Sequence, residues 1–192
     1  MGEIARQAGV GIATVYRRFP TRERLVAAAL LEKVRQYADA AQQAQANPDP
    51  WAGFAGFVRR SCALQANDRG LSDLLSSALP ASEEVEQLRA TVYQRVTDVA
   101  DRAKAAGRLR PDFVPEDLLL VLIANAAVVH ISEPGAPCAW RRLAALFLDA
   151  FQRTGGDCLP AAPTAAQLSR GMARLATERR LGGLEAAPGW PS

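Results

Sequence analysis

Residues 4–25 read IARQAGVGIATVYRRFPTRERL, and this stretch decides the expected fold. We expect a first short helix over residues 2–8, which Gly9 ends because glycine readily adopts a positive φ after a helix. A second short helix is expected over residues 12–19, where Pro20 stops it. Two short helices joined by a glycine turn predict a helix-turn-helix.

The side chains of the second helix divide into two faces at roughly 100° per residue. The face expected to pack on neighbouring helices holds Ile12, Val15 and Phe19, with Tyr16 at its margin. The opposite face holds Ala13, Thr14 and Arg17, with Arg18 on its flank. Small residues let a backbone approach base edges, a guanidinium can bind guanine O6 and N7, and hydroxyls can donate to phosphates. The second face therefore predicts insertion into a DNA major groove.

The formal charge is unevenly distributed along the chain. Residues 1–24 hold five arginines and two glutamates, so the whole formal net charge of +3 lies there, while the remaining residues are balanced. A polyanion is therefore expected to bind at the amino-terminal end.

This segment resembles the DNA-binding domain of the tetracycline-repressor (TetR/AcrR) family of bacterial regulators. The resemblance is carried by Ile4-Ala5, Ala8-Gly9-Val10, Thr14-Val15-Tyr16, Phe19 and the step Arg22-x-x-Leu25. It implies that Thr14 and Tyr16 contact the DNA backbone and that Arg22 binds phosphate, where the family usually has lysine. The implied DNA-binding set is Gly11, Ile12, Ala13, Thr14, Tyr16, Arg17, Arg18, Thr21 and Arg22.

The resemblance also implies that the usual first helix of this domain is lacking. Family members carry a further helix ahead of the segment that begins here at Gly2, and it packs on the positions of Ile4, Val15 and Phe19. We therefore expect the DNA-binding half of the chain as written to be destabilised. A helical small-molecule-binding or interaction protein that has lost DNA binding through truncation at the amino terminus stays open as an alternative.

The rest of the chain predicts an all-α fold with a helical-bundle effector and dimerisation domain. Only 6% of residues are aromatic and alanine is abundant, which favours helix-on-helix packing over sheets. Helices are expected at residues 22–46, 51–66, 71–79, 82–107, 116–132 and 137–153, with Thr21, Asp49 and Ser82 as N-caps. The expected domains are residues 1–46 for DNA binding with the connecting helix, 47–154 for ligand binding and dimerisation, and 155–192 as a tail with one weak helix at 164–181.

Apolar side chains of the middle helices are candidates to wall a cavity for a small, mostly apolar effector. The candidates are Trp51, Phe54, Phe57, Leu75, Tyr93 and Asn125. Stripes of this kind form core more often than pocket, so both interpretations stay open. His130 is expected to be hydrogen-bonded in the interior or at an interface, and Cys62 to be a buried thiol rather than an oxidant sensor.

Two apolar stripes near the carboxyl end predict a homodimer. Residues 116–132 are almost wholly apolar, and residues 137–153 carry apolar side chains at spacings of three and four. Two such helices from each of two subunits would form a four-helix bundle. Closure of the monomer's own core is the alternative.

Several classes of protein are excluded by what the sequence lacks. No run of 18 apolar residues predicts a membrane span, and no signal-peptide pattern is present. Three widely spaced cysteines fit a reduced cytoplasmic protein without a disulfide framework or a metal site. With a single histidine and no catalytic or phosphate-binding motif, the sequence predicts neither an enzyme nor a cofactor. It predicts a ligand-responsive regulator, a repressor that binds a near-palindromic double-stranded operator as a dimer.

Overall fold

The structure, a computed structural model, describes residues 1–67, 82–132, 135–152, 157–168, 170–171 and 174. Every regular element within these ranges is helical, which confirms the all-α prediction. The helices are α1 (Gly2–Gln7), α2 (Ile12–Arg18), α3 (Arg22–Ala46), α4 (Pro50–Asn67), α6 (Glu83–Ala105), α7 (Pro115–Ser132) and α8 (Ala139–Gln152). The helix expected at residues 71–79 lies outside the described residues.

The expected N-caps set the helix starts. The Thr21 hydroxyl accepts from the backbone N–H of Arg24 at 3.3 Å, and the Ser82 hydroxyl accepts from that of Val85 at 3.4 Å. The Asp49 carboxylate accepts from the N–H of Ala52 at 2.9 Å. These bonds satisfy backbone donors that a helix leaves free in its first turn. The predicted starts of α3, α4 and α6 are therefore confirmed to within one residue.

Helix α4 is at the centre of the bundle and packs on α3, α6, α7 and α8. Its Phe54 is fully buried and meets Phe113 and Phe151 edge to face, with ring centroids 5.1 and 6.2 Å away. Gly53 permits the close approach of α3, because a Cβ at this position would lie 2.6 Å from the carbonyl oxygen of Ala44. The core therefore depends on one aromatic cluster and one glycine contact.

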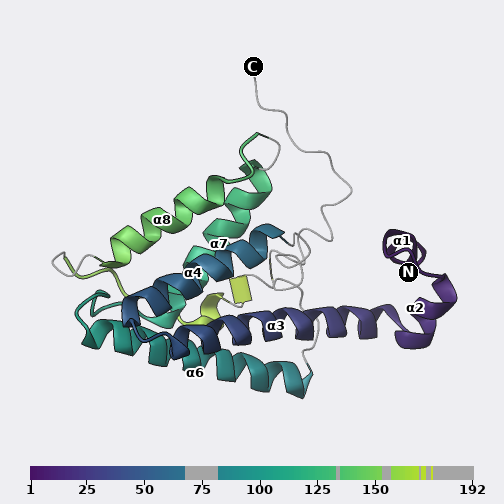
Figure 1. Ribbon diagram of the computed structural model, residues 1–192, viewed down its shortest axis with the longest axis horizontal. Helices are drawn as coiled ribbons and strands as arrows, with labels where there is room; N and C mark the ends of the chain where they lie inside the picture. Colours follow the sequence, from purple (N-terminus) through teal and green to yellow (C-terminus); the bar gives the residue numbers. More distant parts are fainter. Residues whose placement is uncertain (68–81, 133–134, 153–156, 169, 172–173, 175–192) are drawn as a thin grey trace.

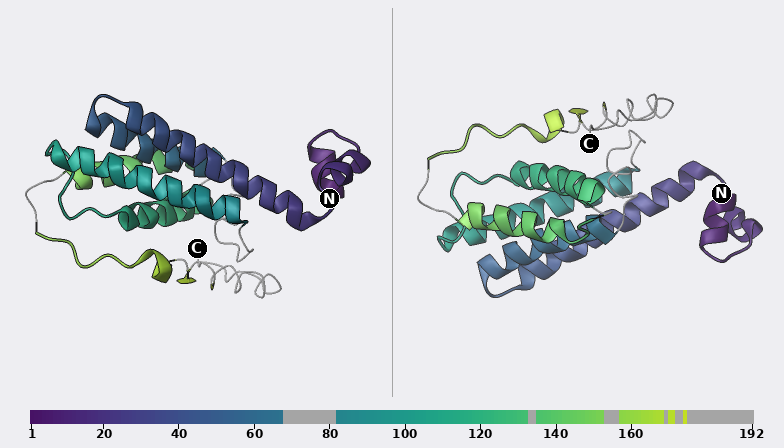
Figure 2. Two further views of the ribbon diagram at one scale, coloured as in Figure 1. Left: turned by 90° about the horizontal axis from the view of Figure 1, so that it is seen from below. Right: turned by 90° about the horizontal axis from the view of Figure 1, so that it is seen from above.

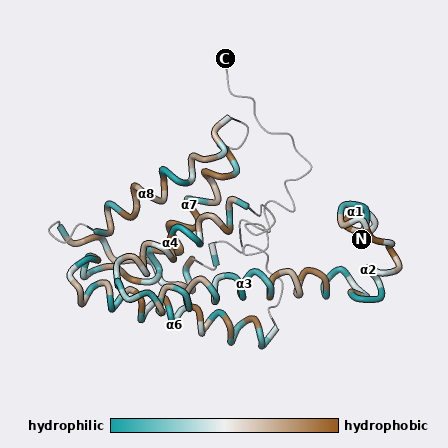
Figure 3. Tube along the Cα trace, viewed as in Figure 1, coloured by the Kyte–Doolittle hydropathy of each residue, from teal (hydrophilic) through white to brown (hydrophobic). Residues whose placement is uncertain are grey.

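Helix α3 extends beyond the bundle and carries α1 and α2 at its far end (Figures 1 and 2). Its 25 residues span about 37 Å at the usual helical rise. The apolar run at residues 25–31 lies on the part of α3 nearest α2 (Figure 3), and Leu30 and Val34 pack with Val85 of α6. The position of α1 and α2 is therefore set through α3.

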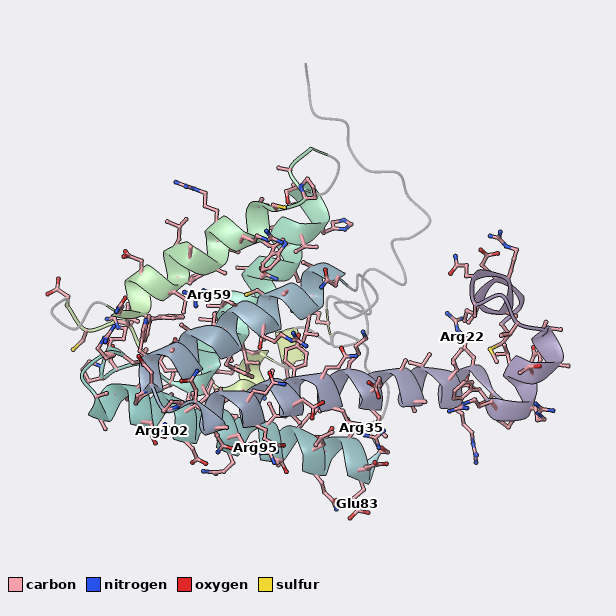
Figure 4. The ribbon with its side chains drawn as sticks, viewed as in Figure 1. Arg22, Arg35, Arg59, Glu83, Arg95 and Arg102 are labelled. Atoms are coloured by element: carbon pink, nitrogen blue, oxygen red, sulfur yellow. The ribbon has the colours of Figure 1, made fainter. Side chains whose placement is uncertain are left out.

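Arginines of α6 hold the end of α3 through its backbone. Arg102 donates to the carbonyl oxygens of Gln45 at 2.6 Å and Asn47 at 2.9 Å, and Arg95 donates to that of Ala38 at 3.1 Å. The last carbonyls of a helix have no partner within the helix and attract positive charge. Figure 4 shows Arg95 and Arg102 following one another along the seam between the two helices. Arg102 thus acts as a carboxyl-terminal cap for α3 from another helix.

The first residues of the expected tail are attached to the loop before α7. Asp112 pairs with Arg110 and accepts from the N–H of Leu159 at 2.9 Å, and Arg110 donates to the carbonyl of Asp157 at 3.2 Å. The hydrogen bond from Arg110 and then that from Leu159 lower the pKa of Asp112 to about 2. Further on, Thr164 caps a helical turn at residues 165–168 by accepting from the N–H of Gln167. The start of the expected weak helix is therefore confirmed.

Removal of the Arg102 guanidinium is expected to loosen the α3–α6 seam. R102A should lower the free energy of unfolding by about 2 kcal/mol, because two carbonyls lose a charged donor. The stability of R102K should lie between those of the native protein and R102A, because an ammonium keeps the charge but cannot donate to both carbonyls as the planar guanidinium does. The measurement is urea unfolding followed by circular dichroism. R89A is the matched control, since among the described residues Arg89 pairs with exposed Glu86 of its own helix. If R102A lowers the free energy of unfolding no more than R89A does, the role of Arg102 in holding the end of α3 is contradicted.

The Asp112 contact is expected to fail in acid. Its carboxyl has a lowered pKa in the folded chain, so the contact is complete above the ordinary value of 3.8 and is lost as pH falls toward about 2. Hydrogen exchange at the Leu159 amide should show protection declining over this interval. D112N should remove the protection at neutral pH, whereas D157N should keep it, because Asp157 contributes only its backbone carbonyl. Protection of Leu159 in D112N would refute this attachment.

Candidate nucleic-acid interface

A glycine turn sets the angle between α1 and α2. Gly9 has φ of 65°, and the next residue, Val10, donates its N–H to the carbonyl of Ala5 at 3.0 Å. Ala5 and Val15 are the buried residues of the two helices, at 3% and 8% exposure. The small Ala5 side chain lets α2 approach α1 closely. The segment is thus a helix-turn-helix, as predicted.

The face of α2 opposite Val15 is open to solvent. Every residue of the implied DNA-binding set is exposed: Gly11, Ile12, Ala13, Thr14, Tyr16, Arg17, Arg18, Thr21 and Arg22. Gly11 is the extended N-cap of α2, which directs the first turn of the helix outward. Thr21 has a second role as the cap of α3, and Arg22 follows it at the helix start (Figure 4). Small residues, hydroxyls and guanidiniums are thus all exposed to solvent on α2 and at the start of α3.

One part of the expected division of faces is wrong. Ile12 was expected to point inward with Val15 and Phe19, but its side chain is 50% exposed and Phe19 is only partly buried. The reason is that α1 has only six residues and covers Val15 in the middle of α2. The end of the Ile12 side chain lies near Gly2, which has no side chain to cover it. Ile4 is likewise 42% exposed. The apolar side of this segment is therefore only partly covered by the described residues.

The basic side chains of this end differ in availability. Arg6 pairs with Glu3 on α1, so its charge is neutralised locally. In the described part of the chain, no carboxylate forms an ion pair with Arg17, Arg18 or Arg22. These three guanidiniums are thus available to an anion, and that of Arg18 lies 5.8 Å from the centroid of the Phe19 ring. The Glu3–Arg6 pair could have been read from its i, i+3 spacing, but sequence analysis counted Arg6 with the others.

The predicted effector residues occupy three different environments. Phe54 and Phe57 are in the core and Trp51 borders it, with its ring centroid 5.7 Å from that of Phe54. Tyr93 is 45% exposed, and its hydroxyl donates to Glu116 at 3.2 Å. Asn125 is fully buried, and Leu75 lies outside the described residues. The structure therefore separates Tyr93 from the buried members of the set.

Asn125 belongs to a polar cluster inside the bundle. Its amide donates to the Cys62 carbonyl at 3.2 Å and to the Gln65 side chain at 2.9 Å. Within the described residues, the Asn125 Oδ1 atom and the Ser61 hydroxyl are buried without a hydrogen-bond partner. Sequence analysis missed Ser61, although its position one turn before Gln65 places both on one face of α4. The cluster is the only strongly polar part of an otherwise apolar interior in the described chain.

Two further expectations concern Cys62 and His130. Cys62 is fully buried, and burial raises the pKa of its thiol to about 11, so the reactive thiolate is scarce at neutral pH. The expectation of a buried, unreactive thiol is confirmed. His130 is exposed on α7, so it is not an interior residue of the single subunit. Its expected place at an interface stays a prediction.

Comparisons with known proteins agree with the geometry at both ends of the chain. Residues 1–29 match the model of the bacterial regulatory proteins of the tetR family, and residues 49–152 match that of the C-terminal domain of SbtR-like transcriptional regulators. The crystal structure of the TetR transcriptional regulator SCO0520 from Streptomyces coelicolor has a TM-score of 0.58 and 31% identity. The match covers 79% of this chain and 86% of that one. A search of curated proteins found no match.

Proposed function

This chain belongs to the TetR family of bacterial regulators, and on this premise we propose that it is a repressor released from its operator by a small effector. Family membership makes it a DNA-binding transcriptional regulator and not an enzyme. The proposal adds a homodimer on a near-palindromic operator in the cytoplasm and a mostly apolar effector bound within each bundle.

The observation that carries the DNA-reading part is the open face of α2. Ala13, Thr14 and Arg17 are exposed, while Val15 on the other side is buried against α1. A helix held by one face and free on the other can enter a major groove. In this proposal Arg17 reads base edges and Arg22, at the start of α3, binds phosphate; both side chains are exposed.

The proposed dimer contact uses α7 and α8. Large apolar side chains on these helices are exposed in the single subunit, namely Leu120, Ile123, Ile131 and Leu146. Ile131 is 77% exposed and Leu146 is 57% exposed. Figure 3 shows the apolar residues along both helices. Burial of these faces in a four-helix bundle with a second subunit would remove them from water.

Helix α7 is long and apolar enough to cross a membrane, judged by length and composition alone. Two features favour a protein contact instead. Its first turn contains the acidic residues Glu116 and Asp117. Its Asn125 is buried and donates a hydrogen bond to the Gln65 side chain of α4. The hydrogen bond joins α7 to α4 within the helical bundle, so we propose that a second subunit covers its exposed apolar face.

The polar cluster around Asn125 supports an effector site within the bundle. The unpartnered Asn125 Oδ1 and Ser61 hydroxyl can anchor a polar group of an otherwise apolar ligand. Helix α4, which carries Ser61, packs directly on α3. A ligand that shifts α4 would therefore shift α3 and the spacing of the two reading helices in the dimer.

Two arginine substitutions are expected to affect DNA binding in different ways. R17A should relax preference at one base pair by about 1–3 kcal/mol, because it removes a base contact. R22A should weaken binding to all DNA sequences evenly, because it removes a phosphate contact. It should also reduce by about one the slope of the logarithm of the binding constant against the logarithm of salt concentration. Both effects are measured by mobility-shift titrations at several salt concentrations, with the intergenic DNA that surrounds the gene for this chain.

The control for these titrations is R108A, because Arg108 is exposed near the end of α6 that lies far from α2 (Figure 1). It should leave both affinity and salt slope unchanged. Equal, sequence-independent losses from R17A and R22A would contradict the assigned roles. The absence of any salt-sensitive complex would favour the alternative of a helical binding protein that no longer contacts DNA.

Charge placed on the proposed dimer face should separate the subunits. The double variant I123E/L146E is expected to halve the mass measured by light scattering after size exclusion, because two carboxylates would be buried in an apolar contact. A90E is the matched control, since Ala90 is exposed on α6. An unchanged mass in I123E/L146E, with helical content preserved, would place the contact elsewhere.

A further inference from the structure

A basic groove lies between α4 and the first turns of α8, and none of the exposed apolar residues of the proposed dimer face on α7 and α8 lines it. It has a volume of about 520 Å³ and is lined by arginines from both helices, Arg59 and Arg60 from α4 and Arg141 from α8. Figure 4 shows Arg59 on α4 beside α8, far from Arg22 at the DNA-binding end. The volume is within the range of about 300–1,000 Å³ that is usual for small-ligand sites.

Among the described residues, the arginines of the groove have no carboxylate partner. No acidic residue of the described ranges lines the groove, and α4 contains no aspartate or glutamate over Pro50–Asn67. In the part of the chain that the structure describes, Arg59, Arg60 and Arg141 form no ion pair with a carboxylate. The three guanidiniums that line the groove offer many N–H donors, and like charges on one small surface repel one another. A bound anion would reduce that repulsion.

The floor of the groove is apolar and partly aromatic. Trp140, Ala63 and Ala144 complete the lining, and the Arg141 guanidinium lies 5.4 Å from the centroid of the Trp140 ring. Trp140 is partly buried against the core, and the stacked Arg141 and Trp140 side chains form one wall beside the small alanines. A flat apolar group can pack there while an attached acidic group meets the arginines. The lining therefore favours an organic anion over an inorganic ion.

We propose that this groove is a ligand site for a small, flat organic anion, a carboxylate, sulfonate or phosphate ester on an aromatic or similarly planar body. The acidic group pairs with Arg59 and Arg141, and the planar body packs along Ala63, Ala144 and the stacked Arg141 and Trp140 side chains. The site differs from the polar cluster at Asn125, which is fully buried, and it does not depend on the repressor mechanism.

The test uses the full-length protein and two dyes of similar shape. The anionic probe is 8-anilinonaphthalene-1-sulfonate, and the neutral probe is N-phenyl-1-naphthylamine, which reports apolar sites without a charge requirement. Fluorescence titrations are compared for the native protein, R59Q/R141Q and R142Q. Arg142 is exposed on α8 but does not line the groove, so R142Q controls for loss of charge alone. A fourth variant, A145W, fills the groove from an exposed position and keeps the arginines.

The expected result is salt-sensitive binding of the anionic dye that weakens at least tenfold in R59Q/R141Q and in A145W. Binding in R142Q and binding of the neutral dye should stay within twofold of the native values. Equal affinity for the anionic dye in native protein and R59Q/R141Q would overturn the proposal. A change of oligomeric mass in R59Q/R141Q would also overturn it, because the groove would then be a contact between copies of the chain.

Discussion

The attachment of α2 to the bundle through one long helix is the constraint on which the rest of the structure depends. Neither α1 nor α2 makes an extensive contact with α4, α6, α7 or α8, so their position follows from the direction of α3. That direction is held at the other end by the hydrogen bonds of Arg102 to the last carbonyls of α3 and by the contact of Gly53 with Ala44. We therefore propose that a change in the bundle displaces α2 through α3.

The arginines at the two ends of the molecule differ in what they contact. At the amino-terminal end, the Glu3–Arg6 pair leaves the arginines of α2 and the start of α3 as the free positive surface. In the bundle, Arg95 and Arg102 are used structurally, because they satisfy backbone carbonyls of α3. Arginine caps a helix in the bundle, and we propose that it binds DNA at the other end; the formal net charge of +3 does not distinguish these roles.

Local signals were sufficient to predict most helix boundaries but not the contacts between helices. Thr21 and Ser82 cap helices through bonds that span three residues, so the sequence alone indicates them. The Arg102 bonds to α3 join residues more than 50 positions apart, and nothing near Arg102 marks its partners. Ile12 was misplaced because its burial depends on what covers α2 from outside, which helical periodicity does not report. The domain limits and the roles of the DNA-facing residues stay predictions.

The measurement that tests the central claim most directly is dimethyl sulfate protection of guanine N7 on operator DNA, because N7 lies in the major groove. We predict two protected patches separated by about one helical turn or a multiple of it. Protection of a guanine within each patch should disappear when Arg17 is replaced by alanine. Protein binding without N7 protection, or with protection unchanged by that substitution, would contradict insertion of α2 into the major groove.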